Sequence, residues 1–194
     1  MSIAMHEWPR RHRISVEHYY RMAEAGLFGP DERVELIDGE IVDMPPMGTR
    51  HAAKLSRLVE ILSAAVGDRA IVRVQLPLRL GEASEPQPDV AVVVPRADYY
   101  DQRHPGAADT LLAIEVSDTT LRFDSEIKAP LYIRHGVPEA CILDLRANRL
   151  LRFRLSAADR ELVAAESDLG PIGIDALPGI TVNLEPLATR APEK

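Results

Sequence analysis

Two acidic residues adjoin apolar runs that are typical of buried strands. Asp89 opens the run 89–94, Asp-Val-Ala-Val-Val-Val, and Glu115 lies near the end of the run 111–116, Leu-Leu-Ala-Ile-Glu-Val. A charged group in such a place is costly unless it is paired, hydrogen-bonded or bound to a metal. If the two strands pair antiparallel, the start of one lies beside the end of the other, and the carboxylates meet at one edge of the sheet. Carboxylates about 4 to 6 Å apart repel each other unless a proton or cation lies between them.

The oxygen ligands of Asp89 and Glu115 favour Mg²⁺ or Mn²⁺ over zinc. The alternative from residue types alone is that Asp89 only begins a strand after Pro88 and that Glu115 pairs with an arginine. Lys128 follows Glu115 by 13 residues near the start of an expected helix. A helix that returns across the sheet could bring its ammonium to the carboxylates, although a helical lysine is more often solvated.

Glu35 and His51 are two further candidates. Glu35 alternates with Val34 and Leu36, so it is either an exposed strand residue or an additional carboxylate directed at the cleft. His51 begins an expected helix, where a lone histidine is more often a cap or a surface residue than a ligand. The chain has neither a Cys/His cluster of the zinc type nor a glycine-rich phosphate-binding loop.

The elements that must position these residues are expected from periodicity and turn signals. We expect a helix capped by Ser15 and ended at Gly26, and a hairpin over 33–44 that turns at Asp38-Gly39. Further elements are expected as follows: a helix over 51–66, a strand over 70–80 interrupted at Pro77, strands at 89–94 and 111–116, a helix over 124–135 capped by Asp124 and kinked or started near Pro130, a hairpin over 140–155, a strand near 161–165, and a terminal segment around 179–187.

Composition fits a globular protein of 194 residues, with 46% hydrophobic and 27% charged residues. No apolar run approaches the roughly 18 to 20 residues that span a bilayer, and the first residues have no apolar segment of the signal-peptide type. We therefore expect a cytoplasmic protein. The net charge of −7 counts against extensive, sequence-independent binding of nucleic-acid phosphates but not against a metal site built of carboxylates. The single cysteine, Cys141, is expected to be a buried structural thiol.

The order of several short motifs resembles the Uma2 family of restriction-endonuclease-like proteins, which belong to the PD-(D/E)XK nuclease superfamily. The resemblance covers about residues 13 to 187. It rests on Glu35-Leu36-Ile37-Asp38-Gly39-Glu40, His51, Gln75-Leu76-Pro77, Glu85-Pro86-Gln87-Pro88-Asp89-Val90, Ile114-Glu115-Val116-Ser117, Lys128-Ala129-Pro130-Leu131-Tyr132 and Gly136-Val137-Pro138-Glu139.

The resemblance implies an α/β (α+β) restriction-endonuclease-like fold, with a central mixed sheet flanked by helices. It implies Mg²⁺-dependent hydrolysis of nucleic acid, DNA by preference, with Asp89 and Glu115 as metal ligands and Glu35 completing the acidic cluster. The superfamily pattern has a lysine two residues after the second acid, where this chain has Ser117. The resemblance therefore assigns the basic role to Lys128.

The expected organisation is an N-terminal extension over 1–12, a single domain over 13–187 and a disordered tail over 188–194. A homodimer is expected because two sites related by a two-fold axis can cut both strands of a duplex. The alternative function is a catalytically silent nuclease fold that serves as an interaction or regulatory module.

Overall fold

A six-stranded mixed sheet forms the centre of the protein in a computed structural model that describes residues 11–188. The strand order is β3–β4–β5–β6–β7–β8. All neighbours pair antiparallel except β5 and β6, which are parallel. The strands are β3 (Ile71–Val74), β4 (Val90–Val93), β5 (Thr110–Ser117), β6 (Ala140–Asp144), β7 (Arg149–Leu155) and β8 (Leu162–Asp168).

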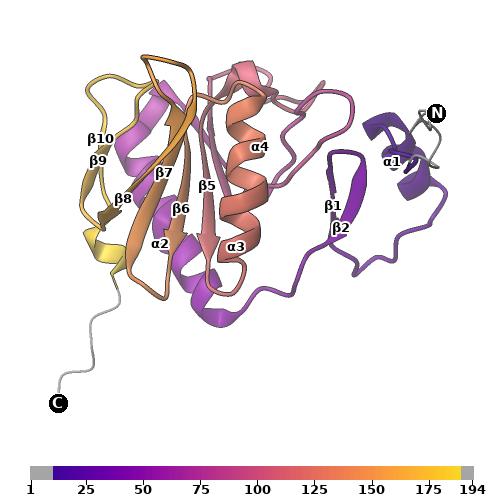
Figure 1. Cartoon of the computed structure of the whole chain (residues 1–194), viewed down its shortest axis with the longest axis horizontal. Coiled ribbons are helices and arrows are strands. Elements are labelled where there is room, and N and C mark those ends of the chain that lie inside the picture. The colour runs from indigo at the N-terminus through magenta and orange to yellow at the C-terminus, as the bar shows by residue number, and fades with distance from the viewer. Residues whose placement is uncertain (1–10, 189–194) are drawn as a thin grey trace, which may run out of the picture.

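Helices cover both faces of this sheet (Figure 1). Helix α2 (Thr49–Val66) lies on one face, and its Leu58 and Leu62 pack into a core with Val92 of β4. A helical stretch made of α3 (Leu121–Phe123), a π-helical turn over Asp124–Lys128 and α4 (Ala129–Arg134) crosses the other face. It makes the long connection that the parallel pair β5 and β6 requires. The expected mixed sheet flanked by helices is confirmed.

The N-terminal part lies beside this layered body (Figure 1). Helix α1 (Val16–Glu24) is capped by Ser15, whose side chain accepts a hydrogen bond from the backbone of His18. The hairpin of β1 (Val34–Ile37) and β2 (Glu40–Asp43) follows, and Asp38 and Gly39 at its turn both have positive φ angles, of 49° and 78°. Both elements agree with the sequence prediction, since Asp-Gly is favoured where two successive residues must adopt positive φ.

Three sequence predictions need correction. The expected strand over 70–80 ends at Val74, because Gln75 takes a φ of 50° and leaves the ladder before Pro77 is reached. β3 is nevertheless an edge strand, as expected from Pro77. The helix expected over 124–135 begins earlier, at Leu121, so Asp124 is an interior residue and not the cap.

Pro130 is accommodated by the π-helical turn that precedes it. The amide of Ala129 bonds to the carbonyl of Asp124, five residues back. The wide turn loosens the helix where proline provides no N–H and its ring would otherwise clash with a carbonyl. The helix therefore passes through Pro130 without ending there.

The remaining elements complete the sheet and its cover. β6 and β7 form the expected hairpin, with Asn148 at positive φ in the turn, and β8 extends the strand expected near 161–165. Two short strands, β9 (Pro171–Gly173) and β10 (Thr181–Asn183), pair with each other, and β10 contacts α2. Cys141 is buried, as expected. The tail expected to be disordered lies almost entirely in 189–194, outside the described residues. Within 11–188, no helix has both the length and the apolar character needed to cross a membrane.

The core face of α2 gives a stability prediction. Leu62→Ala should lower the free energy of unfolding by about 2 to 5 kcal/mol, because Leu62 is fully buried and its truncation leaves a cavity. Urea denaturation followed by circular dichroism measures this change. Leu27→Ala is the matched control, since Leu27 is 63% exposed and its replacement should change stability by less than about 0.5 kcal/mol.

Candidate active site

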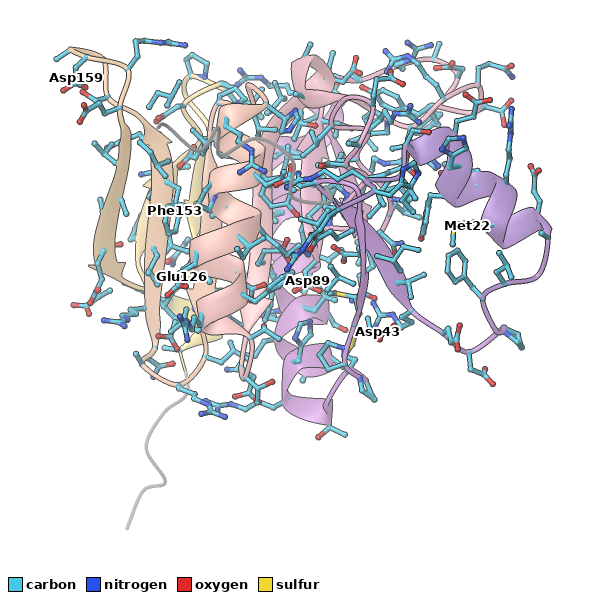
Figure 2. All side chains as sticks on the ribbon, turned by 45° about the vertical axis from the view of Figure 1, so that its right-hand side comes forward. Met22, Asp43, Asp89, Glu126, Phe153 and Asp159 are labelled. Atoms are coloured by element: carbon cyan, nitrogen blue, oxygen red, sulfur yellow. The ribbon has the colours of Figure 1, made fainter. Side chains whose placement is uncertain are left out.

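The antiparallel pairing of β4 with β5 places Asp89 beside Glu115. Val90 pairs with Ile114, so Asp89, one residue earlier, lies opposite Glu115. The backbone N–H of Asp89 donates to Glu115 Oε2 at 3.3 Å, and the backbone N–H of Val116 donates to Asp89 Oδ2 at 2.8 Å. The two carboxylates therefore meet at one end of the two strands, where the sequence predicted them. In the view of Figure 2, Asp89 lies between the helical stretch that carries Glu126 and the β1–β2 hairpin that carries Asp43.

Lys128 reaches the same place from the helical stretch that covers this face. Its ammonium lies 2.8 Å from Glu115 Oε1 and 3.3 Å from both carboxylate oxygens of Glu35. The side chains of all three residues are almost completely buried, with exposed fractions of 4 to 5%. The ammonium of Lys128 thus links three segments: the hairpin, β5 and the helix.

Glu35 is the additional carboxylate and not an exposed strand residue. Every residue of β1 is buried, because the hairpin packs against the segment around Glu85 on one side and against the site on the other. Glu35 Oε2 accepts no hydrogen bond of good geometry, although it is within ion-pair distance of Lys128. A buried carboxylate oxygen that lacks a hydrogen bond retains the capacity to bind a cation or water.

Four residues contribute to the site besides Glu35, Asp89, Glu115 and Lys128, and one of them, His51, is the further candidate named from the sequence. His51, in the first turn of α2, has its Nε2 3.0 Å from Asp89 Oδ1 and is neither a cap nor a free surface residue. Gln75 donates to the same oxygen at 3.1 Å, and Tyr132 donates its hydroxyl to Glu115 Oε1 at 2.5 Å. Asp124 is buried and accepts a hydrogen bond from the hydroxyl of Thr120 at 2.6 Å.

Only part of this could have been found by sequence reasoning. The sequence predicts His51 at the start of a helix, which is confirmed, whereas its prediction of Asp124 as a helix cap is wrong. Gln75 gave no signal beyond its place before Leu76-Pro77. Tyr132 follows Lys128 by four residues, one helical turn, so the two side chains share a face. That spacing was the available signal for Tyr132.

Burial and the excess of acids shape the ionisation of this cluster. Burial raises the pKa of Glu115 to about 8, even though Lys128 acts to lower it. Burial likewise raises the pKa of Glu35 and of Asp124. Burial alone would lower the pKa of Lys128, but the charges of Glu115 and Glu35 outweigh it, and the net shift is upward. Lys128 therefore stays charged, while the carboxylates around it repel each other and favour a further cation.

Asp89 and His51 form a second charged pair at the same site. The hydrogen bond to Asp89 raises the pKa of His51, against the opposing effect of burial. Burial acts to raise the pKa of Asp89, but its bonds to His51 and to the backbone of Val116 outweigh it and lower the pKa. Asp89 is thus the carboxylate of the cluster that stays ionised most readily.

The donor set fits a hard divalent cation held by few protein ligands. Within the described residues, no group of three or more histidine, cysteine or acidic side chains is arranged to enclose a metal. Mg²⁺ commonly takes one or two carboxylates and keeps several waters. Asp89 and Glu115 meet that need, and the buried Oε2 of Glu35 can bind a water of the shell.

Comparisons with known proteins identify the family and the fold of the chain. The family model Uma2, described as "Putative restriction endonuclease", matches residues 16–185. The fold is similar to a crystal structure from Anabaena variabilis described as "a putative nuclease belonging to DUF820", with a TM-score of 0.67, 16% sequence identity and coverage of 90% of this chain and 97% of that one. The search of curated proteins gave no match.

The His51–Asp89 pair predicts a histidine titration that NMR can follow in the metal-free protein. The midpoint of His51 should lie above the ordinary value of about 6.5. The pair then stabilises the fold fully below that value, and this stabilisation is lost as the pH rises through the raised midpoint. Asp89→Asn should return the midpoint of His51 toward or below 6.5. His135, whose pKa is lowered chiefly by burial, is the internal reference and should not respond. An unchanged His51 midpoint in the variant would contradict the pairing.

Removing Lys128 should destabilise the protein in a pH-dependent way. Lys128→Met leaves Glu115 and Glu35 buried without their cation, at a loss of about 3 to 5 kcal/mol near pH 8. The loss should shrink toward pH 5, because carboxyls with raised pKa values bind protons more readily in the folded state than in the unfolded state. Urea denaturation at both pH values measures it. Lys54→Met, which removes a hydrogen bond to the carbonyl of Leu187, should show a smaller loss that does not depend on pH.

Proposed function

Because this chain belongs to the Uma2 family of nuclease-like proteins, we propose that it is a Mg²⁺-dependent (or Mn²⁺-dependent) endonuclease that hydrolyses phosphodiester bonds, with DNA as its preferred nucleic acid. The observation that carries the proposal is the convergence of Asp89, Glu115, Glu35 and Lys128 in one pocket from four separate segments. A structural role alone would not gather several carboxylates around a single buried lysine, because unpaired buried charges are costly.

In this proposal Asp89 and Glu115 hold the divalent cation. A bound cation of this kind lowers the pKa of water and stabilises negative charge on phosphate. Glu35 supports the hydration shell through its buried Oε2. Tyr132 fixes the orientation of Glu115 through its hydroxyl, and the backbone N–H of Val116 fixes Asp89.

Lys128 is proposed to orient the attacking water or to neutralise charge that develops on the phosphate. This role is supported by the position of its ammonium, 2.8 Å from Glu115 Oε1 and 3.3 Å from Glu35 Oε2, because an ammonium held among carboxylates stays protonated and can act as a permanent donor. The helix supplies the cation where Ser117 occupies the position of the superfamily lysine. Ser117 is itself buried, and its hydroxyl lies near the Thr120 hydroxyl and forms a hydrogen bond with Asp124.

We further propose that the protein works in the cytoplasm as a homodimer, in which a two-fold axis would bring two sites to one nucleic acid. Analytical ultracentrifugation tests the dimer directly.

Substitution of Asp89 tests the metal site. Asp89→Ala should abolish Mg²⁺-dependent cleavage of a DNA substrate and weaken Mn²⁺ binding in a calorimetric titration, because one of the two anionic ligands is lost. Asp68→Ala is the matched control: Asp68 is exposed at the end of α2, away from the site, and its replacement should change neither readout. The parent protein must bind Mn²⁺ in the same titration. If it binds no metal and cuts no DNA, the chain is a catalytically silent module; if Asp89→Ala cuts as well as the parent, the site assignment is wrong.

A further inference from the structure

The acidic cluster lies in a pocket and not on an open surface. The cavity has a volume of about 370 Å³, within the range of about 300 to 1,000 Å³ that is typical of pockets for small molecules. Its acidic end is deep, since the side chains of Glu115, Glu35 and Lys128 are only 4 to 5% exposed. A phosphodiester must therefore enter the pocket to reach Asp89 and Glu115.

Two segments give this pocket an apolar wall. The connection from β2 to α2 contributes Met44, Pro45, Pro46 and Met47, and α3 contributes Phe123. Phe123, Met44 and Met47 are half-buried, so part of each side chain remains available to a ligand. A site that only bound the sugar–phosphate backbone would have no use for an apolar wall, whereas a nucleobase stacks on aromatic and apolar side chains.

The charges around the pocket disfavour a duplex. Six acidic residues line it, against Arg33, Lys128 and His51; Lys128 is already paired with Glu115 and Glu35, and His51 with Asp89. Arg33 is exposed at the pocket and makes no ion pair with any residue of the described part of the chain. Stable duplex binding depends on many lysine and arginine contacts to phosphates. The exposed Arg33 is suited to binding one phosphate of a single-stranded nucleic acid.

We propose that the pocket takes an unpaired nucleotide of single-stranded DNA, with the base against Phe123 and the Met44–Met47 segment, and with a phosphate held by Arg33. This inference rests on the proposed function and names its substrate class. An unpaired strand can insert one nucleotide into the pocket, whereas a paired base is held in its stack and must first be extruded.

The test compares three substrates in the presence of Mn²⁺: a thymidine strand of about 12 nucleotides, the same strand in a duplex, and a strand of equal length built of abasic residues. We expect kcat/KM for the thymidine strand to exceed both others by about tenfold or more, the effect of one base–aromatic stack. Phe123→Ala should raise KM for the thymidine strand by about tenfold while changing KM for the abasic strand much less. A loss of folding would lower turnover of both strands equally.

Ile127→Ala is the matched control, because Ile127 is an exposed apolar residue of the same helical stretch that does not line the pocket. It should leave both KM values unchanged. Equal or faster cleavage of the duplex, or equal cleavage of the abasic strand, overturns the inference and leaves the nuclease assignment intact. If none of the three substrates is cut while Mn²⁺ is present, the proposed function is overturned and the inference with it.

Discussion

The ion pairs of the Lys128 ammonium with Glu35 and Glu115 are the interaction on which the packing of the hairpin and the helix against the sheet depends. It lies among carboxylates from β5 and from the β1–β2 hairpin, and it is carried by the helical stretch that connects β5 to β6. In water, such pairs contribute little, but in a buried site each charge must find its partner. The charge of Lys128 therefore holds the hairpin, the sheet and the helix together. One ammonium does not balance all the carboxylates of the cluster, and a divalent cation can supply the missing positive charge.

The position of the site follows from the sheet. β4 and β5 pair antiparallel, so residues far apart in the sequence meet at one end of the strands. Backbone N–H groups of Asp89 and Val116 orient the opposite carboxylates. Side chains held by strand backbone are pre-organised, which suits the proposed cation site.

Sequence patterns were sufficient for much of the fold and for the proximity of Asp89 and Glu115 at the centre of the candidate site. Periodicity and turn residues located α2, the two hairpins and the buried strands, because these depend on local burial and local φ preferences. Asp89 and Glu115 were found because charge beside apolar strands is unusual. The π-helical turn was not found, since its cause is the local conflict between Pro130 and the packing of the helix on the sheet. His51 and Gln75 depend on long-range contacts with Asp89, and no short pattern encodes those contacts.

The π-helical turn over Asp124–Lys128 has a consequence for how such chains diverge. A π turn holds one residue more than an ordinary α-helical turn, so it determines the direction around the helix axis in which the following side chains point. Loss of a single residue there would restore a regular helix and rotate the face that carries Lys128 and Tyr132 by roughly 100° relative to the preceding turn. The sheet and its core would remain folded, but the ammonium of Lys128 would no longer lie beside the carboxylates. Chain length between Glu115 and Lys128 is thus a marker of which relatives retain a complete site, independent of whether each acidic residue is present.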